Sequence, residues 1–176
     1  MQPIAITQGD PAGIGPEIVA KAFRDAPDAL RHCFVVGDVA TVRRAAGVIT
    51  RPGVPGVPVA QIGAPGEAAD VPPRCIPVLQ LPGIPGPQPW GEISPAAGRA
   101  AADSVVWAAR AALRGEVAAL VTAPLHKEAL SAAGVDFPGH TELLQAEAAA
   151  HQGVSLAQMP VPVSYTHLTL PTTPYV

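Results

Sequence analysis

Short apolar segments alternate with helical patterns at the start of the chain. Residues 4–7 are a candidate for a buried strand, and the glycine-rich turn after them leads to Pro16. Proline suits the first turn of a helix because its missing N–H is not needed there. We expect a helix over about 16–26 and a second strand over 32–36.

A second helix and a proline-rich segment follow. Asp38 is expected to cap a helix through about residue 46, which Gly47 ends in a left-handed conformation. The order strand, helix, strand, helix is typical of a parallel α/β layer. Residues 51–89 then contain 11 Pro and 6 Gly in 39 positions, which disfavours long helices and central strands. We expect an irregular excursion with 75–79 as its one candidate strand.

The pattern becomes regular again at Ser94, which can cap a helix of small apolar residues that runs to Gly115. Residues 117–122 are a nearly continuous apolar run, as expected of a parallel strand covered on both faces. A short helix over 125–133 and a turn leading into a helix over about 137–151 complete the predicted elements.

The end of the chain has a different composition. Glu147 is the last charged residue, so the closing 29 residues carry no charge. Alanine occurs 33 times up to Ala157 and not afterwards, whereas 164–176 holds both tyrosines and four of the nine threonines. We predict that 1–163 is a partial N-terminal part of a larger fold and that 164–176 is a non-native, disordered tail.

Composition and charge exclude several classes of protein. With 48% hydrophobic and 14% charged residues, the chain can bury a core and is not a charged disordered polypeptide. Its net charge of −3 provides no cationic surface for nucleic acid. No apolar run approaches the roughly 20 residues that cross a bilayer, and Cys33 and Cys75 are too few for a disulfide scaffold. We expect a cytoplasmic protein whose partners include neither nucleic acid nor membrane.

The glycine-rich turn over 9–15 has the chemistry of an anion site without a nucleotide fingerprint. The dinucleotide pattern needs Gly or Ala where Ile18 stands, and the Gly-Lys-Ser/Thr of a P-loop is missing. Free N–H groups at a helix start can still bind an anion. A plain strand-to-helix turn is the simpler interpretation of these glycines.

Residues 139–142, Gly-His-Thr-Glu, have the same geometry with more suitable chemistry. Thr141 can cap a helix while its hydroxyl and the following N–H groups face a phosphate, and His140 can orient a hydroxyl or neutralise charge. Lys127, just beyond the last predicted strand, can also reach an anion. The alternatives are a simple cap, a loop histidine and a solvated lysine. The sequence marks neither a catalytic nucleophile nor a metal site.

Four segments carry a family resemblance: Ile-Thr-Gln-Gly-Asp-Pro-Ala-Gly-Ile-Gly-Pro-Glu over 6–17, Gly-Glu-Ile-Ser over 91–94 with Gly98, Thr-Ala-Pro-Leu-His-Lys over 122–127, and the segment 139–142. In this order and spacing they resemble the 4-hydroxythreonine-4-phosphate dehydrogenase family, over roughly the first half of a family member. The resemblance implies a truncated three-layer α/β/α fold of the isopropylmalate-dehydrogenase-like type and a homodimer.

The resemblance also implies a reaction. Family members use NAD to oxidise 4-phosphohydroxy-L-threonine, with decarboxylation, in pyridoxal 5'-phosphate biosynthesis. His140 and Thr141 match the substrate-binding His-Thr pair of the family. A divalent metal would polarise the substrate hydroxyl, and its histidine ligands are expected in the missing C-terminal half. The chain offers no residue that we assign to catalysis, cofactor binding or metal binding, and we expect this fragment alone to be inactive.

Thr166-His167-Leu168 imitates a metal-binding segment of the family. His167 is not assigned as a ligand, because it lies too close to His140 in the sequence, lacks the apolar strand that should precede it, and falls in the compositionally distinct tail. Two other functions stay open: a paralogous dehydrogenase of 4-phospho-threonate or 4-phospho-erythronate, and a catalytically inactive phosphate-binding module.

Overall fold

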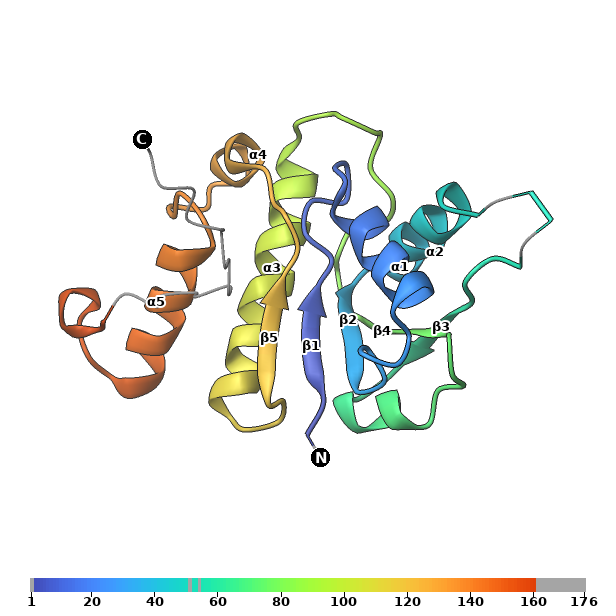
Figure 1. Cartoon of the computed structure of the whole chain (residues 1–176). Coiled ribbons are helices and arrows are strands. Elements are labelled where there is room, and N and C mark those ends of the chain that lie inside the picture. Colours follow the sequence, from blue (N-terminus) through green and yellow to red (C-terminus); the bar gives the residue numbers. More distant parts are fainter. Residues whose placement is uncertain (1, 51, 54, 161–176) are drawn as a thin grey trace, which may run out of the picture.

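A five-stranded parallel sheet with strand order β3-β4-β2-β1-β5 forms the centre of the molecule (Figure 1). The computed structural model describes residues 2–50, 52–53 and 55–160. The strands are β1 (Ile4–Thr7), β2 (Cys33–Gly37), β3 (Val59–Ile62), β4 (Ile76–Gln80) and β5 (Ala119–Thr122). All the strands point the same way, so their carboxyl ends meet at one edge of the sheet.

Helices cover both faces of the sheet (Figure 1). One core cluster joins β1, β2 and β4 to α1 (Gly15–Asp25) and α2 (Val39–Val48). The other cluster joins the opposite face to α3 (Pro95–Leu113) and to the short 3-10 helix η1 (Pro65–Ala69). The predicted three-layer α/β/α arrangement is therefore confirmed.

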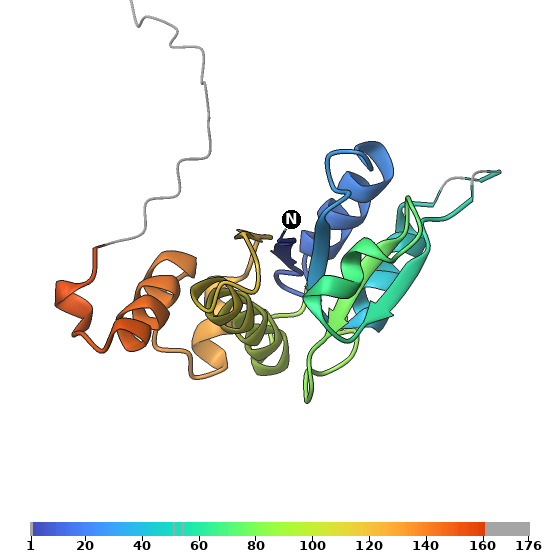
Figure 2. The same cartoon turned by 90° about the horizontal axis from the view of Figure 1, so that it is seen from below.

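The last helices pack on α3 rather than on the sheet. Leu130 of α4 (Lys127–Ala132) and Leu143 of α5 (His140–Gln152) form a third cluster with Ala102 and Val105 of α3. Figure 2 shows α5 at the outer end of this row, before the 3-10 helix η2 (Leu156–Gln158). None of the helices in the described part of the chain is long and apolar enough to cross a bilayer.

Three predictions about the elements are wrong. Gly47 does not end α2 in a left-handed conformation, because it lies inside a helix that continues to Val48. The proline-rich segment contains the strand β3 in addition to the predicted β4. The strand over 117–122 is not covered on both faces: β5 lies at an edge of the sheet, and Val121 is 52% exposed.

Candidate functional site

The first and third family-like segments meet at the carboxyl edge of the sheet. The Asp10 N–H donates to the carbonyl of Pro124 at 2.9 Å. Gly9 lies against the same carbonyl, since a Cβ placed on Gly9 would be 2.3 Å from the Pro124 oxygen. Gly9 also has a φ of 71°, in the region that favours glycine. The turn after β1 therefore fixes the position of the loop after β5.

The fourth segment joins the same place from α5. The His140 imidazole makes a hydrogen bond with the backbone of Ala123. Residues from both segments line a hollow of about 350 Å³: Pro124, Leu125, Lys127, Pro138, Gly139, His140, Thr141 and Glu142. The structure thus brings together the three side chains that the sequence analysis singled out, namely those of Lys127, His140 and Thr141.

His140 is suited to accept a hydrogen bond. Burial lowers the pKa of His140 below its ordinary value, and the hydrogen bond with Ala123 opposes this shift. Because this hydrogen bond favours the protonated ring, a ring N–H is its donor and the Ala123 carbonyl is its acceptor. The Nε2 atom is shielded from solvent and has no partner among the described residues. In the neutral ring, Nε2 therefore carries a lone pair that no described group occupies.

Thr141 does not cap the helix, which corrects the sequence-based expectation. The N-cap of α5 is Gly139, which has no side chain to accept a hydrogen bond, and Thr141 is an exposed residue one position after His140. The Thr141 hydroxyl therefore makes no capping hydrogen bond with the helix backbone. The first N–H groups of α5 remain open toward the hollow, where the helix dipole favours an anion.

The starts of α2 and α3 are closed by the chain's own side chains, whereas α1 has no side-chain cap. Asp38 Oδ2 accepts from the Thr41 N–H at 2.6 Å, Gln8 Oε1 accepts from the Asp38 N–H at 2.8 Å, and Gln80 Oε1 accepts from the Val39 N–H at 2.8 Å. At α3, Ser94 Oγ accepts from the Ala97 N–H at 3.1 Å. The amino ends of α2 and α3 thus have fewer free donors than that of α5.

The second family-like segment is held beside the first by Arg44, a residue that the sequence analysis missed. The Arg44 guanidinium donates to the carbonyls of Gln88 at 2.5 Å and Pro11 at 2.8 Å, and it stacks on the Trp90 ring at 3.8 Å. The Gly91 N–H donates to the Ala12 carbonyl at 2.8 Å. An arginine in an amphipathic helix gives no sequence signal of this role.

The described residues show no group of three or more His, Cys, Asp or Glu that could hold a metal ion. Asp10, the acidic residue of the first segment, accepts a hydrogen bond from the Ala12 N–H at 2.9 Å and so stabilises its own turn. His167 and the tail over 164–176 lie outside the described residues, so their assignments stay predictions.

The comparisons with known proteins identify the family of this chain. The family model described as pyridoxal phosphate biosynthetic protein PdxA matches residues 29–172. A 4-hydroxythreonine-4-phosphate dehydrogenase of Beijerinckia indica is 41% identical over 88% of this chain and 44% of its own length. A D-threonate 4-phosphate dehydrogenase of Salmonella typhimurium is 43% identical over 80% of this chain and 42% of its own length.

A solved structure has the same fold. The crystal structure of 4-hydroxythreonine-4-phosphate dehydrogenase from Klebsiella pneumoniae is 40% identical and superposes with a TM-score of 0.74, over 84% of this chain and 44% of that one. The chain spans less than half the length of these relatives. Fold, motifs and matches agree, and the chain belongs to the PdxA family of dehydrogenases.

Proposed function

We propose that this chain forms the phosphate-binding part of an enzyme that oxidises 4-phosphohydroxy-L-threonine with NAD and decarboxylates the product, in pyridoxal 5'-phosphate biosynthesis. The observation that carries the proposal is the hollow of about 350 Å³ where the segment around Lys127 meets the open amino end of α5. The homodimer and the cytoplasmic location implied by the resemblance belong to the same proposal.

The phosphate has three kinds of donor in this hollow. The uncapped N–H groups at the start of α5 point along the helix dipole, the Thr141 hydroxyl makes no capping hydrogen bond, and Lys127 also lines the hollow. Backbone amides and a lysine are typical partners of a bound anion, and the acidic Glu142 also lines the hollow. We expect the phosphate to occupy this position.

His140 has a different role from the phosphate donors. Its neutral ring has a lone pair on Nε2 and is fixed by the bond with Ala123. Such a ring accepts a hydrogen bond from a substrate hydroxyl and orients it. In this proposal His140 positions the hydroxyl-bearing carbon chain, while α5 and Lys127 hold the phosphate.

The family resemblance implies NAD and a divalent metal ion as cofactors. No group of three or more His, Cys, Asp or Glu that could hold a metal ion occurs in the described ranges. A divalent metal would act as a Lewis acid on the substrate hydroxyl. We propose that its ligands, and the NAD site, belong to sequence that this chain does not contain.

A second candidate reaction is oxidation of D-threonate 4-phosphate. Relatives with that name are as similar to this chain as the first group, at 41% and 43% identity. Both substrates present a phosphate and a hydroxyl, which are the groups that the hollow can bind. A catalytically inactive phosphate-binding module is the third possibility.

Calorimetric titration of the chain tests the proposal. We expect 4-hydroxythreonine 4-phosphate to bind and the same compound without its phosphate to bind at least tenfold more weakly, a difference of about 1.4 kcal/mol. A parallel titration with D-threonate 4-phosphate compares the affinities of the chain for the two candidate substrates. Equal affinity for the phosphorylated and unphosphorylated compounds would exclude the phosphate site.

A further inference from the structure

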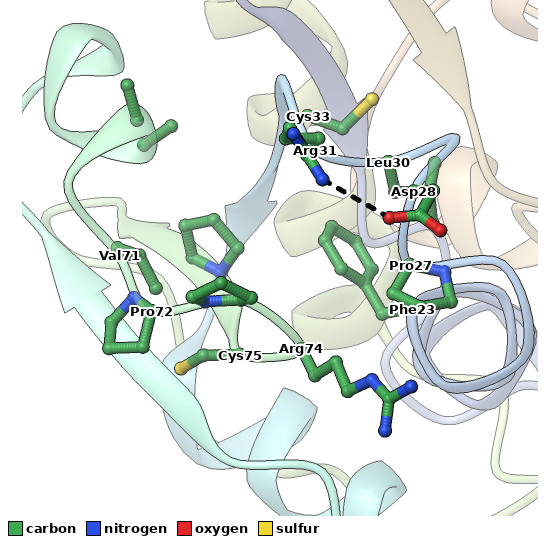
Figure 3. A pocket seen from close by; sticks show the side chains of 14 residues that line it. Phe23, Pro27, Asp28, Leu30, Arg31, Cys33, Val71, Pro72, Arg74 and Cys75 are labelled. Carbon is green, nitrogen blue, oxygen red and sulfur yellow. Dashed lines mark hydrogen bonds and ion pairs between the residues drawn. The ribbon is translucent and has the colours of Figure 1, made fainter.

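We propose that the chain carries a second binding site, for small monocarboxylates with a flat apolar body, at the amino ends of β2 and β4. A cavity of about 350 Å³ lies there, at the edge of the sheet opposite the hollow beside α5 (Figure 3). Sites for small molecules typically have volumes of about 300–1,000 Å³. The cavity is built from residues 23–33 and 68–77 and shares no residue with the hollow beside α5.

The floor of this cavity is apolar. Phe23 and Cys33 line it, but at 3% and 5% exposure they are almost completely covered by the protein. Leucine, valine and proline side chains complete the walls: Pro27, Leu30, Val71, Pro72, Pro73 and Pro77. Pro27 is half-buried and Pro72 and Pro73 are exposed, so proline rings supply the accessible apolar surface against which a planar apolar group can pack.

Two arginines give the cavity a positive charge. Arg31 is 3.4 Å from Asp28, and the side chains of this pair are 71% and 94% exposed, so water screens their attraction. Arg74 has neither a hydrogen bond nor an ion pair with any described residue. In the view of Figure 3 the Phe23 ring lies between the two arginines. Two guanidinium groups and one carboxylate leave a net charge of +1, which matches one carboxylate on a ligand.

The backbone at Arg74 supports a role for this side chain. Arg74 is the one non-glycine residue with positive φ in the described part of the chain, at 64°. This conformation is unfavourable for arginine and is tolerated by glycine or asparagine. The turn before β4 therefore holds Arg74 in a backbone conformation that glycine or asparagine would adopt more easily.

The two thiols do not make this a reactive site. Burial raises the pKa of both Cys33 and Cys75 above the ordinary value. Protonated thiols are poor nucleophiles and contribute apolar wall surface. The site is thus one for reversible binding.

Titration of the 15N-labelled chain with benzoate, followed by NMR, tests the inference. We expect saturable shifts of amides in 28–33 and 71–75 but not in 139–142, and at least tenfold weaker binding of the neutral analogue benzamide. Arg74→Asn should weaken benzoate binding about tenfold without unfolding the chain, because asparagine tolerates the positive φ.

The matched control is Arg43→Asn, since Arg43 is exposed on α2 and does not line the cavity. This variant should bind benzoate like the unmodified chain. Three results would each overturn the inference: no saturable shift up to the solubility limit of benzoate, equal affinity for benzoate and benzamide, or unchanged affinity in Arg74→Asn. The phosphate site is unaffected by any of them, because its residues lie at the other edge of the sheet.

Discussion

At the residue scale, substitution of Thr141 is expected to change the affinity for ligand but not the stability of the fold. Since Gly139 and not Thr141 is the N-cap of α5, Thr141→Ala removes no backbone hydrogen bond. We expect the free energy of unfolding to change by less than about 0.5 kcal/mol, while affinity for a phosphorylated hydroxy acid falls by about 1 kcal/mol, or roughly fivefold. Denaturant titration and calorimetry measure the two effects. Thr141→Ser keeps the hydroxyl and should retain the affinity.

His140 makes stability depend on pH. Because burial lowers the pKa of His140 in the folded chain, the unfolded chain binds more protons between the two pKa values. The stabilising contribution is complete above the unfolded pKa of about 6.5 and is lost as pH falls below it toward the folded pKa. The free energy of unfolding should therefore fall on acidification across this window.

The His140→Asn variant isolates this contribution. Asparagine has no titrating ring, so the variant should lose less stability than the unmodified chain when denaturant titrations at neutral pH and at about pH 5.5 are compared. Identical losses in the two proteins would show that another group causes the pH dependence.

At the scale of elements, one glycine controls the approach of α4 to α3. A Cβ on Gly98 would lie 1.9 Å from the Ala129 carbonyl oxygen, so even a methyl group must push α4, which begins at Lys127, away from α3. We expect Gly98→Ala to lower the free energy of unfolding by about 1–3 kcal/mol and to shift the NMR signals of residues lining the hollow.

Gly47 is the matched control for Gly98. It also lies inside a helix, and nothing stands within 4 Å of a Cβ at this position. Gly47→Ala should therefore stabilise the chain by about 0.4–1 kcal/mol, because alanine restricts the unfolded state. Equal effects of the two substitutions in denaturant titrations would contradict the close helix contact.

Arg44 links elements that are distant in sequence. It joins α2 to the loop before α3 and to the turn after β1, through two carbonyls and the Trp90 ring. We expect Arg44→Lys, which loses the planar fork, to cost about 1–3 kcal/mol. Arg43→Lys on the exposed side of α2 should cost less than about 0.5 kcal/mol. Denaturant titration compares the two variants.

The sequence predicts an element correctly where residues within that element determine it. The prediction fails where packing against other parts of the chain determines the structure. The caps Asp38 and Ser94 each accept the expected backbone N–H. The strand β4 tolerates Pro77 because its ladder with β2 begins only at Val78, and β3 was missed because an edge strand needs little apolar signal. The exposure of β5 likewise depends on its place in the sheet, which its apolar run does not reveal.

The candidate site was predictable to a similar extent. His140, Thr141 and Lys127 were found from residue type and position, and the structure brings all three to one hollow. The cap at Gly139 was not predicted, because which residue begins a helix depends on φ and ψ angles that a Gly-His-Thr sequence leaves open. The bond of His140 with Ala123 joins segments that only the fold brings together.

At the scale of the whole molecule, the carboxyl ends and the amino ends of the strands border regions of different chemistry. The carboxyl edge holds the open start of α5 and the hollow beside Lys127, whereas the amino edge holds the arginine-rimmed cavity. β5 borders the first region and is itself half exposed, with Val121 facing solvent. An apolar edge strand of this kind is a surface on which further strands can pair.

We expect the 176-residue chain to bind a phosphorylated hydroxy acid without oxidising it. The proposed phosphate site draws its donors from the described residues, but these residues include no group of three or more His, Cys, Asp or Glu that could hold a metal ion. Binding should appear in calorimetry, while NADH absorbance stays flat with substrate, NAD and divalent metal present. A full-length dehydrogenase such as the Beijerinckia relative, 41% identical, is the positive control. Steady NADH formation by the chain would show that residues 1–176 already contain the cofactor and metal sites.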